Sequence, residues 1–297
     1  MIKKDWDPAQ YTQCSDFQYN AAKKFLETCS FKSGASILDI GCGNGKTTHY
    51  IASQLTSGQV IGIDKSADMI KFATTHFKRD NLHFQVMDVK RLNYTAKYYD
   101  AAVSFFCIPW VTNKALAFQN IAKVLKNGAP IYILAAVYEK SQADLITHLT
   151  QKLHWHKYFK NYQSPFCFLN DTNYALYAEF VGINVSSIEK VYIPHKFKNR
   201  AEFHNFYLTL VPQISHLVDE SKKNKFADEL LEDYFKVKGN REYSVTIETI
   251  KFSGQKSAYS MGLNRSISRL SFFTTYIADK EEYKPDNYPK FLRLNGG

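Results

Sequence analysis

A glycine-rich turn is the part of this sequence best suited to bind a ligand. Gly41, Gly43 and Gly45 alternate directly after the mostly apolar run Ile37–Ile40. Glycine tolerates positive φ and lets a backbone approach a ligand without a Cβ in the way. Where such a turn joins a buried strand to a helix N-terminus, its free backbone N–H groups can bind a nucleotide-like ligand. Asp39, within the apolar run, adds a carboxylate that can support the turn.

A second acidic residue, Asp64, lies at the spacing expected of a nucleotide-binding βαβ unit. It ends the apolar segment Val60–Ile63, nineteen residues after Gly45. That is about the offset at which a carboxylate reaches ribose hydroxyls. The dinucleotide motif G-x-G-x-x-G is not met, because Lys46 occupies the position of its third glycine, and the sequence contains no P-loop. The turn therefore differs from both common phosphate-binding motifs.

These elements resemble those of the class I S-adenosylmethionine (SAM) methyltransferases. In that family the glycine turn packs against the methionine part of SAM, the acid ending the second strand binds the ribose, and a third acid lies near the adenine amino group. Here Asp88 directly follows the expected third strand. The alternative is structural: the glycines could form a tight turn, and Asp64 and Asp88 could cap helices.

The resemblance implies that SAM is the cofactor and S-adenosyl-L-homocysteine the product. The residues expected to bind the cofactor are Asp39, Gly41, Cys42, Gly43, Gly45, Asp64, Lys65, Met69, Asp88, Val89 and Ser104. Cys42 and Cys107 would lie near the cofactor, although a buried thiol with a packing role describes both equally well.

The composition argues against several other classes of protein. The net charge of +10 over 297 residues permits a nucleic-acid partner, but the basic excess is spread thinly, so we expect none. The five cysteines include no C-x-x-C pair, so neither a metal site nor a disulfide framework is predicted. With no apolar leader or membrane-spanning stretch, we expect no membrane partner and a cytoplasmic location. The 15% aromatic content would suit an apolar substrate pocket.

Strand-like and helix-like segments alternate through the first half of the chain, which predicts parallel strands with crossover helices. We expect an α/β fold with a Rossmann-like, seven-stranded, mostly parallel sheet, helices on both faces and a helical cap insertion. Ser15 is expected to cap the opening helix. The expected strands are residues 36–40, 59–63, 83–87, 100–105, 130–136, about 184–192 and 243–248.

About fifty residues separate the last two expected strands, which is too many for a structureless loop. We expect two or three helices there that cover the substrate end of the sheet, although an inert insertion would give the same pattern. The expected divisions are a SAM-binding core of residues 1–193 with 239–251, a cap of residues 194–238, and a C-terminal extension of unknown role at 252–297.

The residues after the fourth strand bear on the methyl acceptor, because in class I enzymes they face the methyl group. Nucleic-acid amino-methyltransferases carry an Asn/Asp/Ser-Pro-Pro-aromatic motif there. The segment Phe106–Trp110 has no tandem proline, amide or acid, which disfavours base methylation. Amine, catechol and carbon acceptors usually need a base to remove a proton, whereas a carboxylate needs only orientation and desolvation.

Most of residues 10–250 resemble the branch that contains trans-aconitate and juvenile hormone acid methyltransferases, which are carboxyl O-methyltransferases. The likeness includes Tyr11, Ser15 and Gln18, and the stretch Ser104–Val111. In those enzymes the glutamine and the first tryptophan line the carboxylate pocket, so Gln18 and Trp110 are the candidate catalytic residues. The insect enzymes tend to have histidine where this chain has Pro109, which leaves the acceptor open.

The partner we expect is thus a small molecule, a carboxylic acid in the first place, bound by a monomer or homodimer. Methylation of nitrogen or carbon on a small molecule is the main alternative, and it would require a base. The histidines considered for that role are His154, His156, His195 and His204. A nucleic-acid-binding protein that retains SAM is a further alternative.

Overall fold

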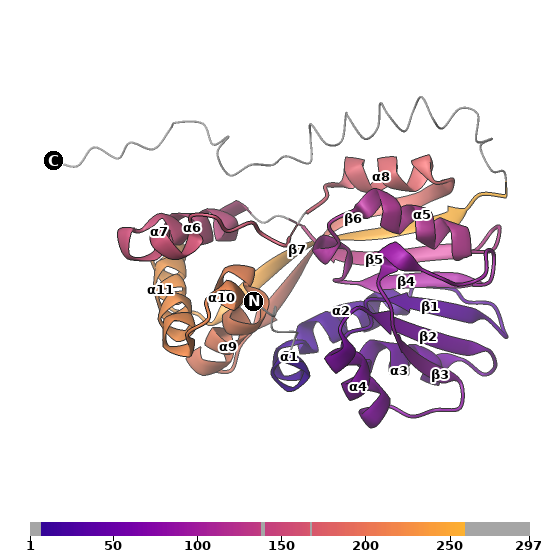
Figure 1. The fold of residues 1–297 in the computed structure, drawn as a ribbon, viewed down its shortest axis with the longest axis horizontal. Coiled ribbons are helices and arrows are strands. Elements are labelled where there is room, and N and C mark those ends of the chain that lie inside the picture. The colour runs from indigo at the N-terminus through magenta and orange to yellow at the C-terminus, as the bar shows by residue number, and fades with distance from the viewer. Residues whose placement is uncertain (1–6, 138–139, 167, 259–297) are drawn as a thin grey trace. The chain divides into compact units, whose positions relative to one another are not determined.

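The described part of the chain is built on a seven-stranded sheet with the order β3-β2-β1-β4-β5-β7-β6 (Figure 1). The computed structural model describes residues 7–137, 140–166 and 168–258, so Cys167 and residues 259–297 of the expected extension lie outside it. The strands are β1 (Ser36–Ile40), β2 (Gln59–Asp64), β3 (Leu82–Val86), β4 (Ala101–Phe105), β5 (Pro130–Ala136), β6 (Ile183–Lys196) and β7 (Ser244–Lys256).

The strand pairing confirms the predicted fold. Strands β1 to β5 pair in parallel, and β7 runs antiparallel to both β5 and β6. The chain proceeds from β1 outward to β2 and β3, then returns to place β4 on the other side of β1. Open α/β sheets bind ligands at such a reversal, outside the carboxyl ends of the strands. The loops after β1 and β4 are therefore the ones placed to form a site.

Helices cover the sheet as predicted. Those of the core are α1 (Pro8–Cys14), α2 (Asp16–Leu26), α3 (Lys46–Gln54), α4 (Ala67–His76), α5 (Lys114–Val124) and α8 (Asp171–Phe180), with two 3₁₀ turns, η1 (Val89–Arg91) and η2 (Ile108–Trp110). Leu26 of α2 and Ile51 of α3 share a buried cluster with Ile37 of β1. Helices α5 and α8 pack on each other through the rings of Phe118 and Tyr177, 5.7 Å apart.

Strands β6 and β7 extend past the rest of the sheet as a two-stranded ribbon that leads to a group of helices (Figure 1). These are α9 (Arg200–Leu210), α10 (Pro212–His216) and α11 (Glu220–Lys238). Helices α6 (Lys140–Gln151) and α7 (Leu153–Phe159) pack beside α11 (Figure 1). The helical group thus draws on two stretches of chain, whereas the sequence pattern had placed α6 and α7 with the core.

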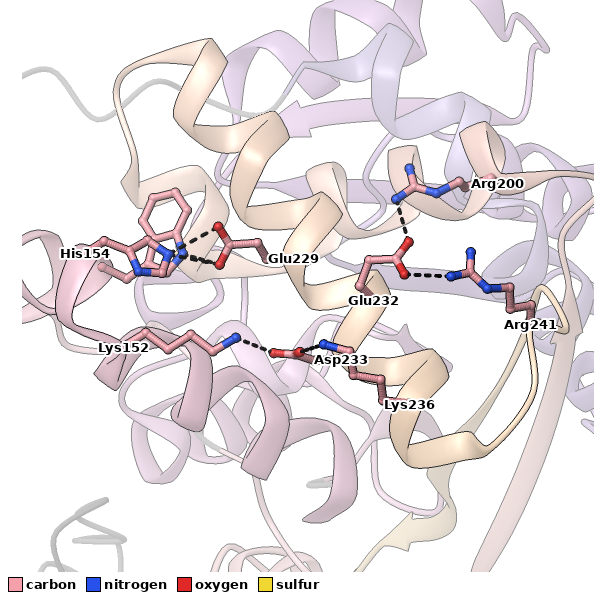
Figure 2. A network of polar contacts seen from close by, with 9 residues as sticks. Lys152, His154, Arg200, Glu229, Glu232, Asp233, Lys236 and Arg241 are labelled. Carbon is pink, nitrogen blue, oxygen red and sulfur yellow. Dashed lines mark hydrogen bonds and ion pairs between the residues drawn. The ribbon is translucent and has the colours of Figure 1, made fainter. Parts of the chain in front are cut away.

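A shared apolar interior and a set of polar contacts hold this helical group together. Trp155 of α7 packs edge-to-face on Phe226 of α11, with ring centroids 5.1 Å apart. Figure 2 shows polar contacts among α7, α9, α11 and the residues that flank them. They are Lys152–Asp233 at 2.8 Å, His154–Glu229 at 3.0 Å, Trp155–Glu229 at 2.9 Å, Arg200–Glu232 at 3.3 Å and Arg241–Glu232 at 3.1 Å.

The last two strands are longer than the sequence pattern indicates. Strand β7 continues to Lys256, so residues 252–256, expected in the C-terminal extension, lie in the sheet. The reason is that β7 lies between β5 and β6: Phe252 faces Ile133 on one side and Ile188 on the other. Both neighbours therefore supply ladder hydrogen bonds beyond the point where the alternation fades. Within the described residues, no helix is long and apolar enough to cross a membrane.

Candidate functional site

A cavity of about 320 Å³ lies at the carboxyl ends of β1, β2, β3 and β4. That volume falls within the range of small-molecule sites. The predicted residues that line it are Gln18, Gly41, Gly43, Asp64, Lys65, Met69, Asp88, Val89 and Trp110. Residues far apart in the sequence thus meet in one place, as the switch point of the sheet requires.

Four predicted cofactor residues lie around this cavity instead of in its wall. Asp39 and Cys42 line a smaller pocket of about 30 Å³, which shares Gly41 with the cavity. Gly45 packs under the turn, where an added Cβ would lie 2.7 Å from that of Ala73. The Ser104 hydroxyl is buried and donates to the Ile40 carbonyl oxygen at 3.0 Å. Gly45 and Ser104 therefore support the walls through packing and hydrogen bonding.

The turn after β1 requires glycine for two physical reasons. Gly41, Gly43 and Gly45 have φ values of 72°, 53° and 83°, a region that residues with a Cβ rarely adopt. In addition, a Cβ on Gly41 would overlap the Cys107 side chain. The segment after β4 therefore packs directly on the turn after β1, and the cavity lies against both.

Asp64 links the end of β2 to this turn. Its Oδ2 accepts a hydrogen bond from the Gly43 N–H at 3.0 Å, and its Oδ1 accepts one from the Ser66 N–H at 2.9 Å. Both of these bonds are to backbone groups, and Asp64 also lines the cavity, which places it beside a bound ligand.

Asp88 both caps a short helix and lines the cavity. It is the N-cap of η1, where its side chain accepts from the Lys90 N–H at 2.9 Å. Its other oxygen lies 3.6 Å from the Lys90 ammonium. Asp88 also lines the cavity. The capping bond therefore fixes a carboxylate at the edge of the site beyond β3.

Asp39 is a buried acid that anchors the turn from below. It is 1% exposed, and its Oδ2 accepts a hydrogen bond from the Thr48 hydroxyl at 2.7 Å. Burial raises the pKa of Asp39 to about 7, because desolvation disfavours its charged form. Thr48 lies in α3, so this bond ties β1 to the helix that follows the turn.

The side of the cavity beyond β4 differs in character from the side beyond β2 and β3. The end of β4 and the residues that follow it form one wall of the cavity. These residues are Phe105, Phe106, Cys107, Trp110, Val111 and Thr112. We call this wall, together with Tyr11, Gln18 and Leu210, the β4 side. The Tyr11 hydroxyl donates to Gln18 Oε1 at 2.5 Å. The Trp110 ring packs on Phe166, with centroids 4.0 Å apart.

Three residues in or beside this wall differ from what the sequence predicts. Tyr11, Ser15 and Gln18 were expected in one opening helix, but Tyr11 lies on a separate helix, α1. The signal for α1 is Pro8 at its first position after Asp7, whose side chain accepts from two backbone N–H groups. Ser15 occupies the N-cap position of α2 but makes no capping bond, and lines the smaller pocket instead. Leu210 comes from α9, and no local signal could have placed it here.

The histidines considered as bases lie elsewhere. His154 pairs with Glu229 in the helical group, and His204 contacts the Asn224 carbonyl oxygen. His195 packs against Phe17 with ring centroids 5.4 Å apart, and burial lowers its pKa. Among the residues that the structure describes, no histidine lines the cavity. His156 is exposed on α7.

Comparison with known proteins shows the family to which the chain belongs. A family profile described as "Methyltransferase domain" matches residues 37–128, from β1 to the turn before β5. The 235L protein of Invertebrate iridescent virus 6, named as a methyltransferase, is 42% identical over 84% of this chain and 92% of its own length. The chain belongs to the class I SAM-dependent methyltransferases.

Two further matches of this methyltransferase are more distant. Juvenile hormone acid O-methyltransferase of Drosophila melanogaster is 26% identical over 56% of this chain and 59% of its own length. The structure of Haemonchus contortus phosphoethanolamine N-methyltransferase 2, solved with phosphomonomethylethanolamine and S-adenosylhomocysteine, superimposes with a TM-score of 0.53. That match covers 84% of this chain and 58% of the other, at 18% identity, and shows a common fold.

Proposed function

We propose that this methyltransferase transfers the methyl group of SAM to a carboxylate oxygen of a small, partly apolar acid. The observation that carries the proposal is the chemistry of the β4 side. It combines one side-chain amide, that of Gln18, with an aromatic and aliphatic wall. Such a pocket can orient a carboxylate and enclose the carbon skeleton of the acid. The residues named on the β4 side include no histidine or carboxylate that could remove a proton from a substrate.

The rest of the cavity suits SAM. The glycine turn would admit the methionine portion, Asp64 would accept hydrogen bonds from the ribose hydroxyls, and Asp88 would lie by the adenine. Lys65, Met69 and Val89 line the cavity near these carboxylates and would contact the nucleoside. Because β4 neighbours β1 in the sheet, this placement directs the methyl group toward the β4 side.

Gln18 is the group proposed to orient the acceptor. Since its Oε1 accepts from the Tyr11 hydroxyl, its Nε2 hydrogens are the donors available to a carboxylate. The rings of Trp110 and Phe106 and the side chain of Leu210 line the same cavity and would pack on the apolar part of the acid. A carboxylate is already anionic, so orientation and exclusion of water supply the acceleration.

The titratable groups on the β4 side support an acceptor that needs no base. Burial raises the pKa of Tyr11 far above neutrality and that of Cys107 to about 12. Both groups are therefore protonated at neutral pH and cannot accept a proton from an amine or a carbon acid. The name of the Drosophila relative, a carboxylic acid O-methyltransferase, points the same way.

The test is transfer of a labelled methyl group from SAM to a pool of small carboxylic acids, followed by mild alkali. A methyl ester releases the label as volatile methanol, which is the expected result. Alkali-stable label would move the acceptor to nitrogen, carbon or an ether oxygen. The rate should stay nearly flat from pH 6 to 8, whereas a base-dependent reaction would rise with pH. Salt-sensitive binding of DNA or RNA would argue for a macromolecular substrate instead.

A further inference from the structure

The segment Cys107–Thr112 forms the wall of the β4 side with almost no regular structure to support it. Four of its residues line the cavity: Cys107, Trp110, Val111 and Thr112. Its internal backbone bonds are those of the short turn η2, in which the N–H of Trp110 donates to Cys107 and that of Val111 to Ile108. A wall that must position an acceptor therefore depends on contacts from outside the segment.

The residue that precedes the segment, Phe106, has a backbone conformation that few residues adopt. Phe106 has a φ of 59°, in the left-handed region, which is an outlier for a bulky residue and persists only where its surroundings enforce it. Its N–H donates to the Leu134 carbonyl oxygen of β5 at 2.6 Å. Its ring packs edge-to-face on Phe17 of α2, 5.7 Å away. These contacts turn the chain sharply out of β4.

At the other end a buried lysine side chain holds the segment. Lys114, the first residue of α5, is 1% exposed, which is rare for lysine. Its Nζ donates to the Val111 carbonyl oxygen at 2.8 Å. Val111 itself lines the cavity. A buried side-chain hydrogen bond to this carbonyl oxygen is costly to leave unmade, so it fixes the backbone next to Trp110.

A third contact joins the segment to the glycine turn. The Cys107 side chain occupies the space that a Cβ on Gly41 would need. With Phe106 at one end and Lys114 at the other, the segment is thus held in register with the turn that would bind the methionine portion of SAM. A displacement of about 1 Å between reacting groups can cost a hundredfold in rate.

We propose that Lys114 and Phe106 are positioning residues. They hold the segment Cys107–Thr112 so that the Trp110 side chain stays in a fixed position relative to the glycine turn. The inference rests on the proposed role of the β4 side in binding the acceptor. It can be tested separately from that proposal, because the conformational order of the Trp110 side chain can be measured in the full-length protein without any acceptor.

The test replaces the three tryptophans by 5-fluorotryptophan and records ¹⁹F NMR spectra, with Trp110→Phe identifying the Trp110 resonance. Lys114→Met retains length but removes the Nζ donor. Lys123→Met, at an exposed position of the same helix, is the matched control. We expect the Trp110 resonance to shift or broaden in Lys114→Met alone, with the remaining resonances unchanged. An unchanged Trp110 resonance in folded Lys114→Met overturns the proposal for Lys114.

Phe106→Gly is an independent variant. It tests whether contacts outside the segment hold Trp110 in place, even if Lys114→Met does not fold. Glycine populates both signs of φ, so the entry to the segment loosens and the Trp110 resonance should broaden. A sharp, unshifted resonance would show that the conformation of Phe106 does not control Trp110.

The functional readout separates positioning from general structural support. S-adenosylhomocysteine should bind Lys114→Met with a Kd within about threefold of the unchanged protein, because the turn and Asp64 are untouched. With an acid that the ester assay identifies, kcat/KM for that acid should fall about tenfold to a hundredfold. Equal losses for cofactor and acid would overturn the positioning role. If the assay finds no acid, the proposed function fails while the ¹⁹F result still stands or falls by itself.

Discussion

The Asp64 carboxylate accepts a hydrogen bond from the Gly43 N–H at 3.0 Å, so the acid that ends β2 also holds the glycine turn that follows β1. Its other oxygen accepts from the Ser66 N–H at the start of α4. One side chain thus fixes two loops at the carboxyl edge of the sheet. A ligand that bonds to Asp64 would meet a turn already set in its binding geometry, which reduces the ordering cost of binding.

Asp64→Ala should weaken SAM binding about a hundredfold or more, because the proposed charge-assisted bonds to the ribose would be lost, each worth about 1.5–3 kcal/mol. Asp64→Asn keeps an oxygen acceptor and should lose less. Asp68→Ala, at an exposed position in the first turn of α4, serves as the control. Titration calorimetry measures all three, and an unchanged Kd in Asp64→Ala would remove the ribose assignment.

Gly41→Ala should destabilise the protein more than the same change at Gly34. Both glycines have positive φ, 72° and 73°, so each substitution incurs a backbone strain of about 1–2 kcal/mol. At Gly34 an added Cβ meets no atom within 4 Å, whereas at Gly41 it overlaps the Cys107 side chain. Urea unfolding of the two variants isolates the steric part. Equal losses of stability would mean that the segment after β4 yields easily.

Asp39 should make the free energy of unfolding depend on pH below neutrality. Its folded pKa of about 7 lies above the ordinary value of 3.8, so the folded state binds more protons between these values. Stability from this group is complete below about pH 4 and is lost as the pH rises toward 7. Asp39→Asn removes the loss, so its stability relative to the original protein should improve by about 2 kcal/mol from pH 5 to pH 8. Urea titrations without SAM test this, and a pH-independent difference would contradict the raised pKa.

The cavity residues that follow β1, β2 and β3 could be predicted from the sequence, because each directly follows a strand that the local sequence pattern indicates. Parallel strands present their carboxyl ends at one edge, so the glycine turn, Asp64 and Asp88 had to meet once the strands were recognised. Leu210 reaches the cavity only because the β6–β7 ribbon carries α9 to α1, where the Thr209 hydroxyl lies 3.5 Å from Cys14 Sγ. Such long-range packing leaves no mark in local periodicity.

The same limit explains the other differences. The pattern near residues 142–153 predicts a helix, which is α6, whereas α7 was not predicted. The sequence of a helix does not indicate which partner covers its apolar face. Here the partner is α11, through Trp155 and Phe226. The left-handed Phe106 is equally hidden, since side-chain type predicts such a conformation only for glycine and a few polar residues.

Glu229→Ala should destabilise the helical group more than Glu232→Ala on the same helix. Glu229 accepts from the indole N–H of Trp155, a residue 2% exposed, and removing the acceptor would leave a buried donor unpaired at about 1–3 kcal/mol. Glu232 pairs with Arg200 and Arg241 at the surface (Figure 2), where exposed ion pairs contribute about 0.2–1 kcal/mol. Urea unfolding compares them, and equal effects would mean that water replaces Glu229.

Trp110→Ala should reduce turnover of the acid far more than it reduces SAM binding. The Trp110 ring lines the cavity and rests on Phe166 with centroids 4.0 Å apart, so its loss widens the β4 side and frees the acid to rotate. We expect kcat/KM for the acid to fall about a hundredfold, with the Kd for SAM within about threefold.

Phe166→Ala is the control that separates contact from support. It removes the ring behind Trp110 but leaves the indole in the wall, so it should reduce kcat/KM less than Trp110→Ala. The comparison requires initial rates at saturating SAM and calorimetry on the same preparations. If Trp110→Ala lowers acid turnover and SAM affinity by the same factor, the indole acts only in packing, and Gln18 alone would be left to orient the acceptor.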